Sequence, residues 1–101
     1  MIEFFSFKGL ALYPKAHRCF LNGQPIKLTD TEFSILKTLL ENKGQTVNTK
    51  DFAKRIWPDE TFVDCKNAIT VHVHHIRRKL NDTQKPYRYI KTSWGAGYIL
   101  E

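Results

Sequence analysis

The segment from Lys66 to Leu80 constrains the fold more than any other part of this chain, because it predicts a helix with two different faces. Its main apolar residues recur at intervals of four, three and four positions. At about 100° per residue, these positions form one narrow stripe along a helix. The stripe consists of Ile69, Val73, Ile76 and Leu80. An apolar stripe of this kind must be buried, so the predicted helix has to pack against other elements.

The opposite face of this predicted helix carries the groups that a DNA major groove can bind. It offers amide, hydroxyl, imidazole and guanidinium groups and one small apolar side chain, which match the donors, acceptors and methyl groups of base edges. The residues on this face or at its margins are Asn67, Thr70, Val71, His74, His75, Arg77 and Arg78. We interpret the face as a candidate surface for reading duplex DNA, the alternative being a solvated polar face.

Positive charge is concentrated around the same segment. From Lys66 to Trp94 there are seven lysines and arginines and a single acidic residue, Asp82, whereas the residues before this stretch are nearly balanced. A block of one sign favours an anionic partner, with nucleic acid ahead of a membrane surface. The cations expected to pair with phosphates include Lys66, Arg77, Arg78 and Lys91, and each such contact would steepen the salt dependence of binding.

Length and composition limit the chain to a single domain, residues 1–101. The 101 residues, 42% of them hydrophobic, suffice for one small core. No apolar run approaches the roughly 18 residues of a membrane span, and no signal-peptide pattern opens the chain. We therefore expect a cytoplasmic protein without a membrane partner. Cys19 and Cys65 match no zinc spacing and are expected to be reduced thiols.

Residues 1–28 predict a small antiparallel sheet. Four short apolar-rich segments alternate with turn signals, among them Asn22-Gly23, which suits a hairpin. A first helix should then begin at Thr29, because Thr29 and Glu32 have the spacing of a capping box. Gly44 suits the position just after the end of this helix, where a left-handed residue is common.

A second helix should start at Asn48 and stop near Trp57, because a proline follows. The next segment, from Pro58 to Cys65, is predicted to be an acidic loop with an apolar tip, and Asp64 is expected to cap the third helix. Such a loop beside a basic helix is a candidate protein contact, although Phe62 could equally pack beneath it. The candidate contact residues are Asp59, Glu60, Phe62 and Val63.

The end of the chain predicts a β-hairpin. Asn81 and Asp82 both tolerate a left-handed helix end, and residues 88–93 and 98–100 read as strands around a glycine-containing reversal. The expected fold class is α+β, a winged helix-turn-helix with an N-terminal antiparallel sheet (1–28), a three-helix core (29–81) and a C-terminal β-hairpin wing (88–101). In that architecture the third helix enters the major groove, and the wing lies on the backbone or in the minor groove.

Several short motifs carry a resemblance to a known family. They are Leu28-Thr-x-x-Glu32-Phe33, Gly44, Asn48-x-x-Asp51, Ile56-Trp57, Val71-His72-Val73, Ile76-Arg77-Arg78-Lys79-Leu80 and Ile90-Lys-Thr92-x-x-Gly95-x-Gly97-Tyr98. In order and spacing the chain resembles the OmpR/PhoB-type effector domain of bacterial response regulators along nearly its whole length. The resemblance implies sequence-specific binding of double-stranded DNA for transcription regulation, usually as a head-to-tail pair on direct repeats. It implies no enzymatic activity and no cofactor.

The resemblance also implies roles for individual residues. On the third helix, the side chains that would face bases or nearby phosphates are Asn67, Thr70, Val71, His74 and His75. Thr92 and Trp94 would contact the backbone from the wing. The family commonly has arginine or lysine where this chain has His74 and His75, and arginine where it has Trp94. We therefore expect an operator different from that of the best-known members.

Two further implications concern partners. The loop from Pro58 to Cys65 would contact RNA polymerase. Domains of this type normally follow a phosphorylatable receiver domain in a two-component system. The alternatives are thus an effector domain of a response regulator, and a stand-alone winged-helix regulator or protein-interaction module without a phosphorelay partner.

The histidines raise one rival interpretation, a metal or catalytic site. His72 and His74 project roughly 160° apart on a helix, and only His72 and His75 share an edge. No third ligand follows at a zinc spacing, so we expect no metal site. A hydrolytic pair of Cys65 and His72 is weaker still, because no glycine-rich oxyanion loop accompanies it. An RNA-binding winged helix is disfavoured because the third helix offers no aromatic platform.

Overall fold

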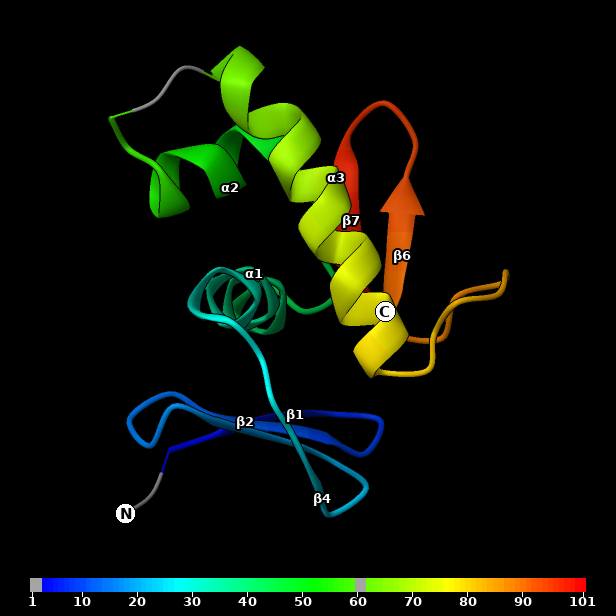
Figure 1. The fold of residues 1–101 in the computed structure, drawn as a ribbon. Coiled ribbons are helices and arrows are strands. Elements are labelled where there is room, and N and C mark those ends of the chain that lie inside the picture. The colour runs from blue at the N-terminus through cyan, green and yellow to red at the C-terminus, as the bar shows by residue number, and fades with distance from the viewer. Residues whose placement is uncertain (1–2, 60–61) are drawn as a thin grey trace.

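The computed structural model describes residues 3–59 and 62–101, except the side chains of residues 62–66. The elements in chain order are β1 (Phe5–Phe7), β2 (Leu10–Tyr13), β3 (Arg18–Leu21), β4 (Gln24–Ile26), α1 (Asp30–Glu41), β5 (Val47–Asn48), α2 (Thr49–Ile56), α3 (Phe62–Lys79), β6 (Ile90–Ser93) and β7 (Gly97–Leu100). In Figure 1, α1 lies between the N-terminal sheet and the other two helices, and α3 runs beside the β6–β7 hairpin. This arrangement confirms the predicted α+β winged-helix fold.

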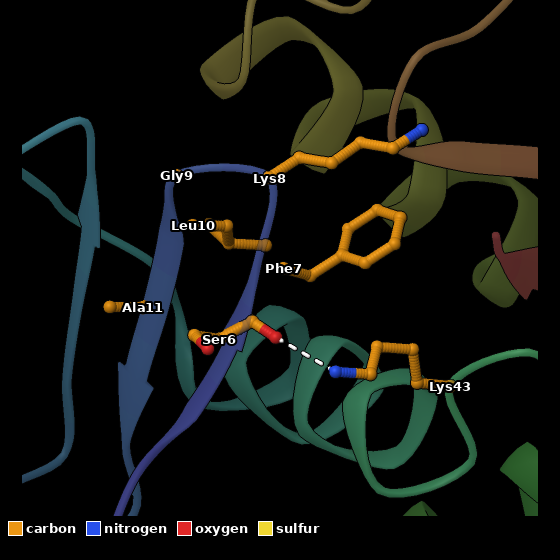
Figure 2. A pocket seen from close by; sticks show the side chains of 7 residues that line it. All are labelled: Ser6, Phe7, Lys8, Gly9, Leu10, Ala11 and Lys43. Atoms are coloured by element: carbon orange, nitrogen blue, oxygen red, sulfur yellow. Dashed lines mark hydrogen bonds between the residues drawn. The ribbon is translucent and has the colours of Figure 1, made fainter.

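The first four strands form an antiparallel sheet in the order β1-β2-β3-β4. Its inner face is apolar, with Leu10, Leu12 and Cys19 fully or almost fully buried. Pro25 lies in the edge strand β4, where the lack of a backbone N–H leaves no ladder bond unmade. Lys43, just beyond α1, fastens the helical core to this sheet: its Nζ donates to the backbone oxygen of Ser6 at 3.1 Å, beside a pocket of about 510 Å³ (Figure 2).

The start of α1 is the predicted capping box. The Glu32 amide donates to Thr29 Oγ1 at 3.2 Å, and the Thr29 amide donates to Glu32 Oε1 at 3.0 Å. The end of α1 differs from the prediction, which placed Gly44 directly after the helix. Asn42 is the C-cap, and Gly44, with φ of +86°, stands two residues after it. The helix therefore ends without a glycine immediately after its cap.

The helix α2 has both predicted ends, with Asn48 accepting from the Asp51 amide and Trp57 as its C-cap. The predicted start of α3 was wrong. The helix begins at Phe62, so Cys65 is helical and Asp64 is not the N-cap. No proline or glycine stands at residues 62–66 to prevent an earlier turn, and an acidic residue is favourable within a first turn. The predicted stripe of α3 is confirmed, because Ile69, Val73, Ile76 and Leu80 are at most 2% exposed.

The wing has a strand that the sequence reasoning missed. The two residues of β5 pair with β7, so the sheet is three-stranded in the order β5-β7-β6 rather than a hairpin alone. Gly97 permits this pairing: a Cβ at this position would lie 2.0 Å from the backbone oxygen of Val47. The strand β5 thereby links the wing to the start of α2.

The connection between α3 and the wing is organised by Asp82. Asn81 has the predicted left-handed conformation, with φ of +56°, but Asp82 does not have a positive φ. Its carboxylate is buried and accepts from the amides of Arg88, Tyr89 and Ile90 at 2.7, 2.9 and 3.2 Å. The amides of Arg88 and Tyr89 thus bond to Asp82 and not to another strand, and β6 starts at Ile90 and not at Arg88. Among the described residues, no helix is both long and apolar enough to cross a membrane.

Candidate nucleic-acid interface

The outer face of α3 is built as the two-faced pattern requires. With the stripe buried in the core, the opposite side chains are left at the surface; those that are exposed are Asn67, Thr70, Val71, His74 and Arg78. Val71 is 51% exposed, so its methyl groups are accessible at the surface. The side chain of Lys66 lies outside the described residues. The face thus presents amide, hydroxyl, methyl, imidazole and guanidinium groups side by side.

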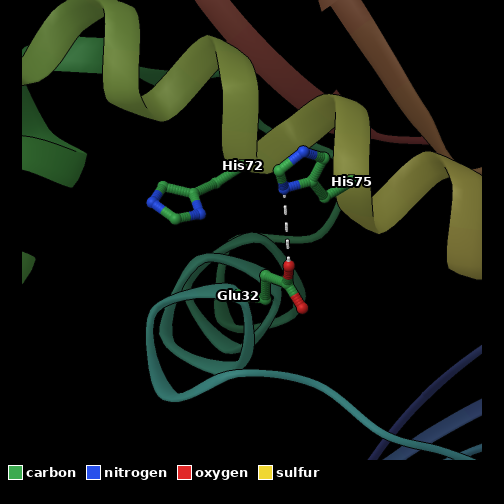
Figure 3. A group of neighbouring side chains, drawn as sticks. All are labelled: Glu32, His72 and His75. Carbon is green, nitrogen blue, oxygen red and sulfur yellow. Dashed lines mark ion pairs between the residues drawn. The ribbon is translucent and has the colours of Figure 1, made fainter.

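His75 and Lys79 lie on the edge of α3 that faces α1. Lys79 Nζ donates to Glu32 Oε1 at 2.5 Å, and His75 Nδ1 lies 3.9 Å from Glu32 Oε2 (Figure 3). Burial by itself raises the pKa of Glu32. Hydrogen bonds from Lys79 and from the Thr29 amide, with the nearby charges of Lys79 and His75, lower that pKa below its ordinary value. The side chain of His75 is 45% exposed, so it borders the outer face of α3 while it also lies near Glu32 of α1.

Arg77 joins α3 to the wing. Its Nε and Nη2 donate to the backbone oxygen of Ile90 at 3.0 and 2.7 Å, and Nη2 also donates to Thr92 Oγ1 at 2.9 Å. Its guanidinium carbon lies 3.7 Å from the centroid of the Tyr87 ring. Burial lowers the pKa of Arg77, while Tyr87, Tyr98 and Asp82 act in the opposite direction. Sequence reasoning assigned Arg77 only a phosphate contact, because nothing in the local pattern reveals a bond to a distant strand.

Trp94 stands at the tip of the wing and is 81% exposed. The ammonium nitrogen of Lys85 lies 5.3 Å from the centroid of its ring, within the range of a cation–π contact. Lys91 and Thr92, further down β6, are half-buried. The predicted wing residues therefore share one strand and its turn, but only Trp94 projects fully.

A groove connects the wing with the outer face of α3. It has a volume of about 460 Å³ and is lined by residues of the α2 start, α3 and the wing turn: Thr49, Thr70, Thr92, Ser93, Trp94, Gly95, Ala96, Gly97 and Tyr98. Several of these residues carry hydroxyl groups, which can donate to phosphate oxygens. Sequence reasoning missed two of these residues. Thr49 directly follows β5, which pairs with β7, and Ser93 is the last residue of β6, where it pairs with Gly97 of β7.

The candidate protein contact is only partly described. Asp59 is exposed. Glu60 lies outside the described residues, and the helical residues Phe62 and Val63 have side chains outside them as well. The four residues are therefore not a single loop, since two of them belong to α3.

Comparison with known proteins gives a consistent result. The family model described as "Transcriptional regulatory protein, C terminal" matches residues 23–100. The regulatory protein VanR of Enterococcus faecium is 48% identical over 93 residues, covering 92% of this chain and 40% of VanR. The response regulator DrrB, a Thermotoga maritima OmpR/PhoB homolog, has a TM-score of 0.84 and 31% identity, covering 96% of this chain and 43% of that one.

A third comparison concerns the fold alone. The DNA-binding domain of Klebsiella pneumoniae RstA, solved in complex with the RstA box, has a TM-score of 0.87 at 24% identity. The similarity covers 97% of this chain and 96% of that domain. By contrast, the chain spans less than half the length of VanR and of DrrB.

Proposed function

This chain belongs to the family of transcriptional regulatory protein C-terminal domains, of OmpR/PhoB type, and on that premise we propose that it binds double-stranded DNA sequence-specifically to regulate transcription. In this proposal α3 enters the major groove, and the β6–β7 wing lies on the backbone or in the minor groove. The family is one of transcription-regulator domains and not a class of enzymes.

The observation that carries the proposal is the outer face of α3, which continues through a hydroxyl-lined groove to the wing. The excess of positive charge between residues 66 and 94 lies on α3, on the connection that follows it and on β6. A winged helix binds duplex DNA with one helix in the major groove and a neighbouring hairpin on the DNA backbone, and positive charge in this region supports both contacts.

We assign selectivity to the exposed side chains of α3. Asn67 can form hydrogen bonds with an adenine edge, Val71 can contact a thymine methyl group, and His74 can donate to guanine. Thr70 and His75 border the same surface. Each well-placed base contact discriminates by roughly 1–3 kcal/mol.

We assign affinity and register to contacts with phosphates. Arg78 is exposed beside the base-reading residues, and Lys66 precedes them in α3. From the wing, Lys91, Thr92 and Trp94 would contact the backbone. Arg77 retains a phosphate contact in this proposal only through the part of its guanidinium that does not bond to Ile90 and Thr92.

For the whole protein we propose an effector domain of a two-component response regulator, because VanR and DrrB extend well beyond the matching region. A head-to-tail pair on direct repeats and a contact between RNA polymerase and residues 58–65 belong to this proposal. The alternative, a stand-alone regulator, keeps the DNA-binding role and removes the phosphorelay.

The decisive experiment is in vitro selection of bound duplexes from a random pool. We expect recovery of a repeated half-site, with the repeats about 10–10.5 base pairs apart. Affinity for the selected duplex, measured by fluorescence anisotropy, should fall steeply with added salt. Arg78→Ala should weaken binding, whereas Lys15→Ala, at an exposed lysine between β2 and β3, serves as the matched control. No enriched sequence, or salt-independent binding, would refute the proposal.

A further inference from the structure

Three potential metal ligands meet between α1 and α3. Glu32 lies in the first turn of α1, and His72 and His75 lie one turn apart on α3. One ligand atom from each residue lies within 4.8 Å of the other two. Figure 3 shows both imidazole rings on the side of α3 that faces Glu32. The third ligand missing from the histidine spacing is thus supplied by another helix.

The ligand chemistry of this cluster suits a transition metal. Two imidazole nitrogens and one carboxylate oxygen form a frequent protein ligand set for Zn²⁺, with water in the fourth position. Tetrahedral Zn²⁺ with bonds of about 2.0–2.1 Å holds its ligands roughly 3.4 Å apart. The ligand atoms of this cluster lie within 4.8 Å of one another, so binding would require His72 and His75 to rotate toward Glu32.

The Nδ1 atoms of His72 and His75 are both available to bind a metal ion. Among the described residues, Nδ1 of His72 is buried and has no hydrogen-bond partner. His75 Nδ1 lies 3.9 Å from Glu32 Oε2, which is too long for a hydrogen bond. A buried polar nitrogen without a partner is unfavourable, and a metal ion bound to its lone pair would remove that deficit.

The cluster also has access from solvent. A surface pocket of about 420 Å³ is lined by Glu32, His75, Arg78 and Lys79. His72 lies further in, with its ring centroid 6.1 Å from that of Trp57. A hydrated ion can therefore reach Glu32 and His75 first and bind His72 as it loses water.

We propose that Glu32, His72 and His75 form a binding site for a divalent transition-metal ion of the Zn²⁺ type, completed by water. Two neighbouring cations oppose this binding. Arg78 lines the same pocket, and Lys79 Nζ donates to Glu32 Oε1, which leaves Oε2 for the metal. The site bridges α1 and α3 behind the outer face of α3. It does not depend on DNA binding, so the two proposals stand or fall separately.

The test is calorimetric titration of the full chain with Zn²⁺ in a buffer that does not chelate the metal. We expect one ion per chain. His72→Gln and His75→Gln should each weaken binding by at least about tenfold. The matched control is His74→Gln, which removes an imidazole from the exposed face of the same helix and should leave zinc affinity within about twofold.

Lys79→Met is a second variant whose expected result cannot be explained by misfolding. Because it removes a competing positive charge beside Glu32, it should tighten zinc binding by several-fold, a gain that loss of structure cannot produce. Circular dichroism checks that each variant is folded. Absence of stoichiometric binding in the unaltered chain, or equal binding in the His72, His74 and His75 variants, would overturn the proposal.

Discussion

Asp82 is the residue on which the start of the wing depends. Its two carboxylate oxygens accept from three backbone amides, two of which are buried. Asp82→Ala would leave these amides without an acceptor, and we expect it to lower the free energy of unfolding by about 3 kcal/mol. Asp82→Asn, which keeps one acceptor oxygen, should have a smaller effect. Urea unfolding measures both.

The control for this prediction is Asp59→Ala, because Asp59 is an exposed acidic residue. It should leave the unfolding midpoint nearly unchanged. If Asp82→Ala has no larger effect than Asp59→Ala, the carboxylate does not hold the wing.

Cys19 should be an inert thiol. The residue is 2% exposed, and burial raises its pKa to about 11, partly offset by a hydrogen bond from the Phe20 backbone. At pH 8 only about one part in a thousand would be thiolate, the form that reacts. In a Cys65→Ser variant, a thiol-specific reagent should therefore label the folded chain far more slowly than the urea-unfolded chain. Comparable labelling rates would contradict the burial of Cys19.

At the scale of elements, short sequence patterns correctly predicted features that depend on neighbouring residues, namely helix caps and a buried helix face. The capping box of Thr29 and Glu32, the Asn48 cap and the buried stripe of α3 all follow from spacing within a few residues. The strand β5 could not be found in this way, because two residues show no periodicity and their partner β7 lies about fifty residues later. Nor could the earlier start of α3, since no strong helix-start signal marks it.

Gly97 tests the missed strand. A Cβ there would meet Val47 O at 2.0 Å and Asn48 Cα at 2.7 Å, so Gly97→Ala should separate β5 from β7. We expect a loss of about 2–3 kcal/mol of unfolding free energy. Gly95→Ala is the control: φ of +77° makes alanine unfavourable there, but nothing lies within 4 Å, so the loss should be about 1 kcal/mol.

Chemical denaturation gives these two free energies, and amide chemical shifts near Val47 report the pairing directly. A Gly97 variant that is as stable as the Gly95 variant, with unchanged shifts at Val47, would mean that β5 does not need the close approach.

Arg77 and Arg78 are neighbours on α3 with opposite expected roles. Arg77→Met removes the bonds to Ile90 and Thr92 and should lower the free energy of unfolding by about 2–3 kcal/mol. Arg78→Met, at an exposed position, should leave stability nearly unchanged but reduce the slope of log affinity against log salt by about 0.9. Thermal unfolding and anisotropy titrations on a selected duplex separate the two effects. Identical profiles for the two variants would refute the division.

At the scale of the molecule, contacts between distant segments determine what the sequence could not predict. The exposed α3 residues were found because helical periodicity places them opposite the stripe. The groove residue Thr49 and the candidate ligand Glu32 could not be found from the sequence, because tertiary packing alone brings them to Thr70 and to His75. The expectation of no metal site was based on histidine spacing within one helix, and that spacing says nothing about a carboxylate on another helix, such as Glu32.

The proposed head-to-tail pair makes a prediction that depends on DNA geometry. Two copies bound to direct repeats about one turn apart lie on the same side of the duplex, where they can touch. Inserting 5 base pairs between the selected half-sites rotates the second copy by about half a turn and should abolish cooperative binding, while leaving affinity for each half-site unchanged. Inserting 10 base pairs returns the second copy to the same side of the duplex but leaves it one turn further from the first. This variant therefore distinguishes the effect of the side from that of the distance between the copies. Gel-shift titrations measure the cooperativity. If it survives the 5-base-pair insertion, the second copy is not placed by contact with the first, and the pair is not an assembly of this chain on one face of DNA.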